Sequence, residues 1–226
     1  MATSSNVRVL VGIRGRRACF SNPSAGKINK FSYPFITVSA ARGVVASVFH
    51  RPQMDWVPTR IAVMRAGRSA NVASNEIDFD LSSTDHVFAD EARMQVSARI
   101  LVDVDYIIEA EPVVLCPGTT DDPNTPEKYA AQFNRILVDG KGLYYSTPCL
   151  GPRQYVGRLY PVERFPERGC AIPDLEVRSM LVGISKGADR RDGGRDYPVF
   201  ADIRLVDGIF SAPRFVSSMF NPGESA

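Results

Sequence analysis

The stretch RMQVSARILVDVDYIIE, residues 93–109, decides the fold that the sequence predicts. It is long and rich in Val and Ile, which is typical of a β-strand. A second strand is predicted upstream, at residues 56–64. The polar, acidic residues between the two predict an irregular loop or a hairpin excursion.

A strand and a helix are predicted before this pair. Residues 7–13 alternate in the manner of a strand, and residues 14–30 predict a basic, glycine-containing loop. Apolar residues then recur at helical spacing up to Phe49, which indicates a helix with one buried face. Ser39 is a suitable N-cap for that helix, and Pro52 lies just past its end.

A second helix and several short strands are predicted after residue 109. Thr125 can cap the helix, Pro126 suits its first position, and its apolar stripe ends before the Asp139-Gly140 turn. Short β segments are predicted at residues 143–146, 154–162, 177–184 and 199–206, with a mobile connection over 185–196.

This order of elements predicts an α+β fold, a ferredoxin-like βαββαβ unit followed by a β-rich C-terminal extension. The length of 226 residues fits one large or two small domains. We predict a first domain over residues 1–148 and the extension over 149–226, or one compact unit that contains both.

Composition excludes several classes of protein. No apolar run approaches the ~20 residues of a membrane helix, and residues 1–6 lack the apolar core of a signal peptide. The four cysteines form no C-x-x-C pair, which suits a reducing cytoplasm, and with two histidines they predict no metal site and no cofactor. A G-x-S-x-G match at residues 183–187 has no later histidine, so it does not indicate a serine hydrolase.

Charge is distributed unevenly although the net charge is only +2. Residues 1–68 hold eleven Lys/Arg and one acid, whereas residues 69–127 hold two Arg and thirteen acids. One interpretation is a basic face that meets an anion, with nucleic acid as the first candidate. The alternative is that the two blocks neutralise each other in the fold.

Basic residues interleaved with aromatic ones favour RNA, because guanidinium groups hold phosphates while rings stack on unpaired bases. The alternative for any one ring is inward packing. The bases and aromatics concerned are Arg16, Arg17, Phe20, Lys27, Lys30, Phe31 and Tyr33, followed by Tyr144, Tyr145, Arg153, Tyr155, Arg158 and Tyr160.

Two further residues are candidates for chemistry. His50, at the end of the first helix, can exchange protons near neutral pH, or it simply caps the helix. Lys128 lies in the first turn of the second helix, where the exposed N–H groups already attract anions, so it is well placed for a phosphate. The alternative for Lys128 is a solvated surface lysine.

Several segments in register resemble the CRISPR-associated protein family five of type I-C systems. The resemblance runs from about Val7 to the Phe220-Asn221-Pro222 end. The segments are Phe31-Ser32-Tyr33-Pro34, Ser39-Ala40-Ala41-Arg42-Gly43-Val44, Arg51-Pro52 with Trp56-Val57, Asp103 to Ala110, Glu127-Lys128 and Cys149-Leu150-Gly151-Pro152-Arg153.

The resemblance implies a ferredoxin-like, RRM-related RNA-binding fold of the repeat-associated (RAMP) type in a Cascade surveillance complex. It implies that the protein holds the 5′ handle of the CRISPR RNA beside backbone (family seven) and large (family eight) subunits and meets target DNA only through the complex. Members of the family also cut the precursor RNA without a metal, which needs a base, an acid and a cation.

The family's catalytic positions are only partly matched. Its tyrosine falls on Phe49, its lysine on Lys128 and its following histidine on Tyr129. His50 is one residue along from Phe49 and is a candidate substitute, although one step on a helix turns a side chain by about 100°.

The leading hypothesis is therefore a handle-binding subunit of a CRISPR ribonucleoprotein. The RNA-binding residues that we predict are Arg16, Arg17, Lys27, Lys30, Arg42, Lys128 and Arg153. The first alternative is an active metal-independent endoribonuclease that uses Lys128 with Tyr129 or His50. The second is a structural adaptor that binds only protein through residues 69–127.

Overall fold

A computed structural model describes residues 7–23, 29–77, 93–116, 118–119, 123–170, 172–185 and 197–213 of the chain. The helices and strands of this part follow in the order β1 (Val9–Ala18), β2 (Asn29–Phe31), α1 (Val38–Val48), β3 (Met54–Arg65), β4 (Arg68–Ile77), β5 (Arg93–Val114), α2 (Pro126–Leu137), β6 (Arg158–Pro161), β7 (Leu175–Ser185), β8 (Tyr197–Leu205) and β9 (Ile209–Ser211).

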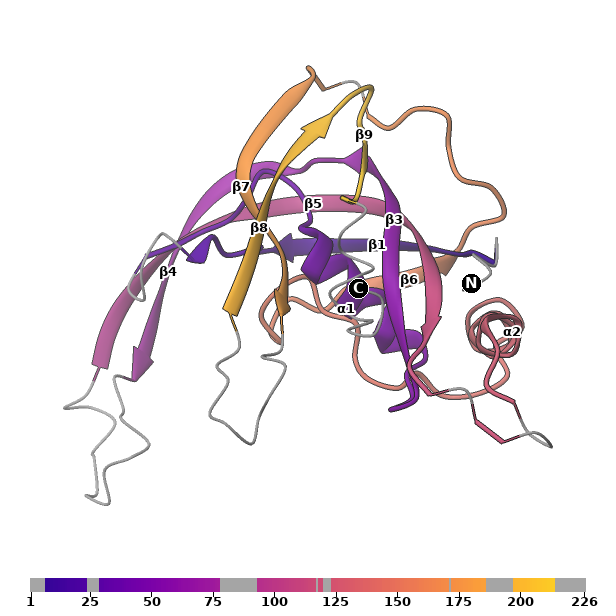
Figure 1. Cartoon of the computed structure of the whole chain (residues 1–226). Helices are drawn as coiled ribbons and strands as arrows, with labels where there is room; N and C mark the ends of the chain where they lie inside the picture. Colours follow the sequence, from indigo (N-terminus) through magenta and orange to yellow (C-terminus); the bar gives the residue numbers. More distant parts are fainter. Residues whose placement is uncertain are drawn as a thin grey trace.

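Strand β5 lies in the middle of the main sheet and has different partners along its length. It has 22 residues and would span about 70 Å if it were straight; Figure 1 shows it curving across the whole molecule. Its second half pairs antiparallel with β1 on one side and β3 on the other. Its first half pairs with β4 and, through three residues, with β2.

The ferredoxin-like fold class is confirmed by the strand order. The main sheet runs β6-β1-β5-β3-β9, and the first four of these strands pair antiparallel. Helix α1 connects the β1 side of the sheet to β3, and α2 connects β5 to β6, so the order is that of a βαββαβ unit with two crossing connections. The predicted excursion between residues 64 and 93 contains β4, which forms an arm with the first half of β5 (Figure 1). Residues 78–92 of that excursion lie outside the described residues.

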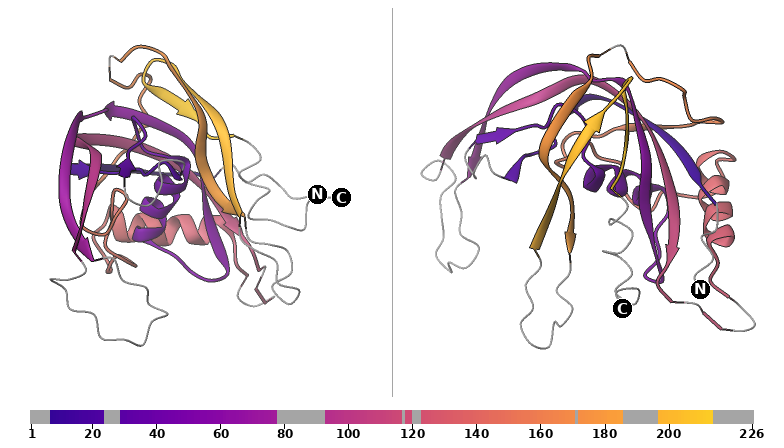
Figure 2. Two further views of the ribbon diagram at one scale, coloured as in Figure 1. Left: turned by 90° about the vertical axis from the view of Figure 1, so that its left-hand side faces the viewer. Right: turned by 45° about the horizontal axis from the view of Figure 1, so that its top comes forward.

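Both helices pack on one face of the main sheet (Figure 2). Helix α1 buries Ala41, Val44, Val45 and Val48 against the sheet, because these positions share one side of the helix. Its N-cap is Thr37, whose side chain accepts a hydrogen bond from the N–H of Ala40, so the prediction of Ser39 as the cap was wrong by two residues. The predicted cap of α2 is confirmed: the Thr125 side chain accepts from the N–H of Lys128. Neither helix in the described ranges is long and apolar enough to cross a membrane.

Two further predictions of local structure were wrong. Residues 14–18 were expected in a loop but belong to β1, because their backbone continues the ladder with β5 to Ala18↔Leu101. Residues 143–146 were expected to form a strand. Instead, the N–H groups of Tyr145 and Ser146 donate to the carbonyls of Val48 and Ser47, so the segment is bound to the last turn of α1.

The C-terminal residues contribute to both sheets. Strand β6 pairs with β1 and β9 pairs with β3, so strands that follow the boundary predicted at 148–149 extend the main sheet at its two edges. Strands β7 and β8 form a separate two-stranded sheet beside α1, and their Met180, Val182, Ile203 and Leu205 join the main core. The division into two domains stays a prediction.

A buried carboxylate lies on the central strand, on the part paired with β1 and β3. Glu109 is only 4% exposed and accepts hydrogen bonds from both Nε and Nη2 of Arg60, at 2.9 and 2.7 Å. The Thr59 hydroxyl and Arg8 also donate to it. Burial by itself raises the pKa of Glu109, but the hydrogen bonds from Arg60 and Thr59 and the charges of Arg60 and Arg8 outweigh burial and leave the pKa below the ordinary 4.5. The folded state therefore favours the ionised carboxylate.

This network predicts an acid-sensitive part of the stability. A folded-state pKa below 4.5 stabilises the protein above that pH, and the contribution is lost as the pH falls through the folded-state pKa. We expect Glu109→Gln to lower the free energy of unfolding by about 2 kcal/mol at pH 7. The gap between the wild type and the variant should shrink below pH 4.5 in urea titrations. A gap that stays constant down to about pH 3 contradicts this account.

Candidate nucleic-acid interface

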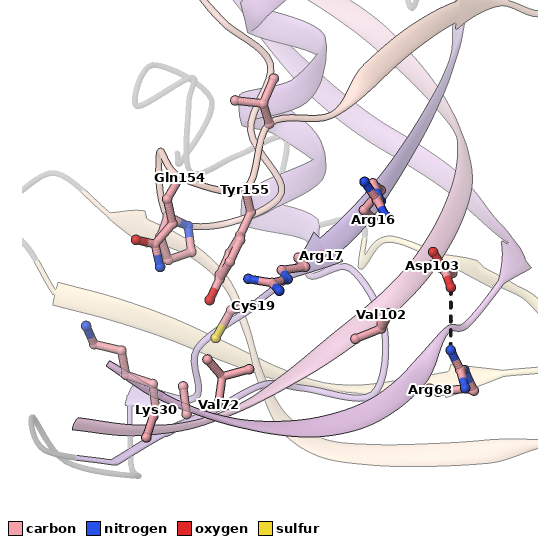
Figure 3. A pocket seen from close by; sticks show the side chains of 14 residues that line it. Arg16, Arg17, Cys19, Lys30, Arg68, Val72, Val102, Asp103, Gln154 and Tyr155 are labelled. Carbon is pink, nitrogen blue, oxygen red and sulfur yellow. Dashed lines mark ion pairs between the residues drawn. The ribbon is translucent and has the colours of Figure 1, made fainter. Parts of the chain in front are cut away.

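A basic cavity of about 890 Å³ opens where β1, β4, β5 and the loop of residues 151–156 meet (Figure 3). Its charged lining residues are four bases, Arg16, Arg17, Lys30 and Arg68, and one acid, Asp103. Half-buried Val72, Ala98 and Val102 and the nearly buried ring of Tyr155 form much of the rest of its wall. The cavity is therefore suited to an anion with flat, partly apolar groups.

A second cavity, of about 380 Å³, continues from the first. The two share Arg16, Asp103 and Val156, and the second adds Arg14, Arg65 and Arg158. We call the two together the basic groove; its seven cationic residues are Arg14, Arg16, Arg17, Lys30, Arg65, Arg68 and Arg158.

Few carboxylates neutralise this groove. In the described ranges, no ion pair joins a carboxylate to Arg14, Arg16, Arg17 or Arg65. Arg68 has one, to Asp103, at 3.7 Å and with both side chains exposed. Clustered cations without counter-charges raise the local positive potential, so the groove attracts anions.

The loop that closes the groove is held by backbone hydrogen bonds. The N–H of Cys19, just after β1, donates to the carbonyl of Leu150, and the N–H of Leu150 donates to the carbonyl of Tyr155. Gly151 has φ +99°, and a Cβ there would overlap the carbonyl of Cys19. Only glycine lets the loop approach β1 this closely. The loop thereby places Tyr155 against Cys19 and Ile100 at the wall of the groove.

Arg14 is oriented by an aromatic ring. Its guanidinium lies over the ring of Tyr160, 4.7 Å from the centroid, and the Tyr160 hydroxyl donates to Asp105 at 2.5 Å. Burial and then the hydrogen bond to Asp105 raise the pKa of Tyr160 above its ordinary value, so the phenol stays protonated at neutral pH. The strand register places Arg14 opposite Asp105 on β5 and opposite Arg158 on β6.

The structure brings together three of the six residues predicted only for RNA binding. Arg16, Arg17 and Lys30 line the basic groove. Arg153 is exposed and stands between two lining residues of the loop without lining the groove itself. Arg42 lies on α1, where its guanidinium binds the nearly buried carboxylate of Asp55 through two hydrogen bonds. Lys27 lies outside the described residues.

Sequence reasoning missed three cations of the groove, Arg14, Arg65 and Arg68, whereas it included Arg158 in the basic and aromatic set that favours RNA and in the strand predicted at residues 154–162. The pattern assigns Arg14 to a loop, but Arg14 lies on β1, which pairs with β6 at the border of the groove. Arg65 and Arg68 flank Gly67, whose φ of +82° makes the turn between β3 and β4. A glycine between two arginines, before a second strand, is a signal that was available in the sequence.

The predicted catalytic residues gather elsewhere, where the end of α1 meets the start of α2. The ring of Tyr129 lies against that of Phe49, with centroids 6.2 Å apart, and the ring of His50 lies 5.2 Å from that of Tyr145. Lys128 is half-buried in the first turn of α2. The structure therefore places Phe49 against Tyr129, with their chain neighbours His50 and Lys128 at the same helix junction, and this junction is distinct from the basic groove.

The chemistry that this second place can perform depends on His50. Phe49 has no titratable group, and the hydroxyl of Tyr129 is buried. His50 is half-buried, and its Nδ1 is buried without a hydrogen-bond partner among the described residues. The neighbouring Tyr144 and Tyr145 are exposed. An imidazole can exchange a proton near neutral pH, and a lysine at a helix N-terminus can attract a phosphate.

Comparisons with known proteins agree on one family. Residues 9–209 match the family Cas_Cas5d, described as CRISPR-associated protein (Cas_Cas5). The chain is 32% identical over 220 residues to a CRISPR pre-crRNA endoribonuclease Cas5d of Thermus thermophilus, covering 91% of each chain. It is 30% identical over 222 residues to a protein of the same name from Mannheimia succiniciproducens, covering 92% of this chain and 96% of that one.

Solved structures share the fold at low identity. The functionally uncharacterised protein SMU1763c of Streptococcus mutans superposes with a TM-score of 0.62 at 19% identity, over 92% of each chain. A chain of a CRISPR RNA-guided surveillance complex superposes with a TM-score of 0.51 at 13% identity, over 95% of this chain and 98% of that one. At these identities the likeness concerns the fold alone.

The ion pair of Arg42 with a nearly buried carboxylate predicts a stability effect that the exposed groove residue Arg16 lacks. We expect Arg42→Ala to lower the free energy of unfolding by about 2 kcal/mol, because the Asp55 carboxylate, 6% exposed, loses its partner. The matched control Arg16→Ala removes an exposed side chain without an ion pair and should change stability by less than about 0.5 kcal/mol. Urea unfolding measures both, and equal effects contradict the assignment.

Proposed function

The chain belongs to the Cas5d family of CRISPR-associated proteins, and on that premise we propose that it binds and caps the 5′ handle of the CRISPR RNA as a subunit of a type I-C-like Cascade ribonucleoprotein. The RNA lies in the basic groove in this proposal. Backbone subunits of family seven and a large subunit of family eight are the proposed protein partners, and target DNA is met only through the complex.

The observation that carries the proposal is the convergence of seven cationic residues on one groove with one acid. RNA phosphates that enter the groove displace counterions, so binding is driven by charge and falls with salt. The exposed guanidinium groups of Arg16, Arg17 and Arg68 can each bind a phosphate through two N–H groups. Tyr155 contributes an apolar wall on which sugar or base edges can rest.

A second candidate function is metal-independent cleavage of the precursor RNA. Two observations favour it: the Thermus and Mannheimia relatives are both called pre-crRNA endoribonucleases, and the ring of Tyr129, which follows Lys128 in the chain, packs against that of Phe49, which precedes His50. In this candidate His50 removes the proton from a 2′-hydroxyl, which attacks the adjacent phosphate. Lys128 stabilises the charge that develops on the phosphate, the 5′-oxygen that leaves takes a proton from water, and protonated His50 returns its proton to the hydroxide so formed.

Handle binding predicts a specific dependence on salt. Repeat RNA from the protein's own locus should bind with an affinity that falls steeply with salt, and Arg16→Ala or Arg68→Ala should each lower the slope of log affinity against log salt by about 0.7. Arg164→Ala is the matched control, since Arg164 is exposed, lines neither cavity of the groove and pairs with exposed Glu167. Fluorescence anisotropy from about 50 to about 400 mM salt gives the slopes. An RNA affinity that does not change with salt, or a salt slope that the groove variants do not lower, contradicts the proposal.

The nuclease candidate predicts a discrete cut in the same RNA that persists in EDTA. Loss of one acid–base group typically costs about 10²- to 10⁴-fold in rate, so His50→Ala and Lys128→Ala should slow the cut by at least about 100-fold while the RNA still binds. Lys141→Ala, at an exposed lysine beyond the end of α2, is the control. A gel shift without a cut rejects the nuclease and leaves handle binding. A stable complex with a basic protein and no RNA binding favours the protein-only adaptor.

A further inference from the structure

Asp103 is an anion in a site built for anions. It lines both cavities of the basic groove, and it is the one acid among their lining residues in the part of the chain that the structure describes. Figure 3 shows it between Arg16 and Arg68. Its own charge repels phosphates, so it weakens the binding that the seven surrounding cations support. A charge that opposes the main attraction needs another explanation.

The backbone at Asp103 is unusual for the middle of a strand. Its φ is +60°, a left-handed conformation that residues with a Cβ seldom adopt. This residue lies where β5 changes its partner strand. β3 pairs with β5 as far as Asp105, and β4 takes over at Val102. On the β1 side the register runs Gly15↔Val104 and Arg17↔Val102, which leaves Arg16 opposite Asp103. The carboxylate is thereby directed to the point shared by the two cavities.

The carboxylate keeps most of its hydrogen-bonding capacity. Within the described residues its contact is the ion pair with Arg68, and at 3.7 Å this is longer than a hydrogen bond. The Asp103 side chain is 51% exposed, so a ligand can reach it. An ionised carboxylate accepts through two oxygens and donates nothing. Its ligand in the groove must therefore present N–H or O–H donors.

Guanine is the unmodified RNA base that fits such a group best. Its Watson–Crick edge carries two adjacent donors, N1–H and N2–H, at a spacing that matches the two oxygens of a carboxylate. On the same edge, adenine, cytosine and uracil place each donor beside an acceptor, which a carboxylate repels. Unpaired RNA bases are commonly recognised on this edge.

We propose that Asp103 determines base specificity in the groove by accepting hydrogen bonds from N1–H and N2–H of one unpaired guanine. Arg16 and Arg68 bind the phosphates beside that nucleotide, and Arg68 also holds the carboxylate in place. A cavity of about 890 Å³ has room for a base with its sugar and phosphate. The inference rests on the proposed function, because it names what the RNA-binding groove reads.

The test changes both the guanine of the RNA and Asp103 of the protein. The full-length protein is titrated with repeat RNA of its own locus and with a set in which each unpaired guanine is replaced singly by inosine, which lacks the N2 amine. For one of these RNAs the wild type should lose about tenfold in affinity. Asp103→Asn should bind that RNA and the unmodified RNA equally. It should also bind a uridine homopolymer more tightly than the wild type does, because a repulsive charge is gone.

Two controls keep the result specific. Asparagine adopts the left-handed backbone as readily as aspartate, so Asp103→Asn tests the carboxylate and not the fold. Asp103→Gly relieves the backbone and should lose discrimination in the same way. Asp139→Asn removes an exposed acid that lines neither cavity and should behave as the wild type.

Other outcomes overturn the inference. If inosine lowers the affinity at no position, Asp103 does not recognise a guanine. The same follows if Asp103→Asn loses as much affinity for the inosine RNA as the wild type does. Handle binding stands in both cases. A penalty for 2′-deoxy substitution that Asp103→Asn abolishes would assign the carboxylate to a ribose hydroxyl instead. Absence of any binding to repeat RNA overturns the proposed function together with this inference.

Discussion

The backbone ladder of β5 is the constraint on which the rest of the structure depends. Every strand of the main sheet except β6 and β9 pairs directly with it, and those two pair with its neighbours β1 and β3. Because β5 is much longer than the strands beside it, β3 is replaced by β4 partway along. The change of partner falls at residues 102–105, next to the turn at Gly67. The basic groove forms at this interruption, so its position follows from the topology of the sheet.

The structure shows one of the two interpretations of the uneven charge, neutralisation within the fold, for part of the basic block. Part of the basic N-terminal block is neutralised by acids of the next block, since Arg8 and Arg60 bind Glu109 and Arg8 also reaches Glu111. These pairs lie on the part of the sheet where β5 meets β1 and β3. Arg14, Arg16 and Arg17 come later in β1, where the groove opens, and keep their charge available. Neutralisation therefore supports the fold, and the remainder of the basic block is available for the RNA binding that we propose.

The two candidate sites differ in how their residues are held. The groove arginines are exposed on strands with fixed register, so they can meet a flexible, charged chain without rearrangement. At the junction of α1 and α2, the rings of Phe49 and Tyr129 pack against each other, the hydroxyl of Tyr129 is buried, and His50 is half-buried. The two proposed functions thus depend on separate parts of this chain, so a variant can lose one of them and keep the other.

Much of the fold was predictable from local patterns. The apolar stripe and cap of α2, the Val- and Ile-rich run of β5 and the order of strands and helices are all expressed in the types and spacing of residues close together in the chain, so they leave a signal in the sequence. The bases of residues 1–68 and the resemblance in six short segments likewise indicated RNA from the amino-acid sequence. Composition and residue spacing express local secondary-structure propensity and charge. The sequence by itself determined these two properties.

The tertiary structure alone decided which bases act together. Arg16 and Arg68 are 52 positions apart and meet only because β1 and β4 both pair with β5. Arg42 has the same charge as Arg16, but the fold places it beside Asp55 and gives it a structural role. The left-handed backbone of Asp103 has no local signature, because it arises where two strands exchange places beside a third. The pairing of strands far apart in the chain cannot be predicted from the periodicity of the sequence. It is this pairing that brings arginines from different strands together in one groove.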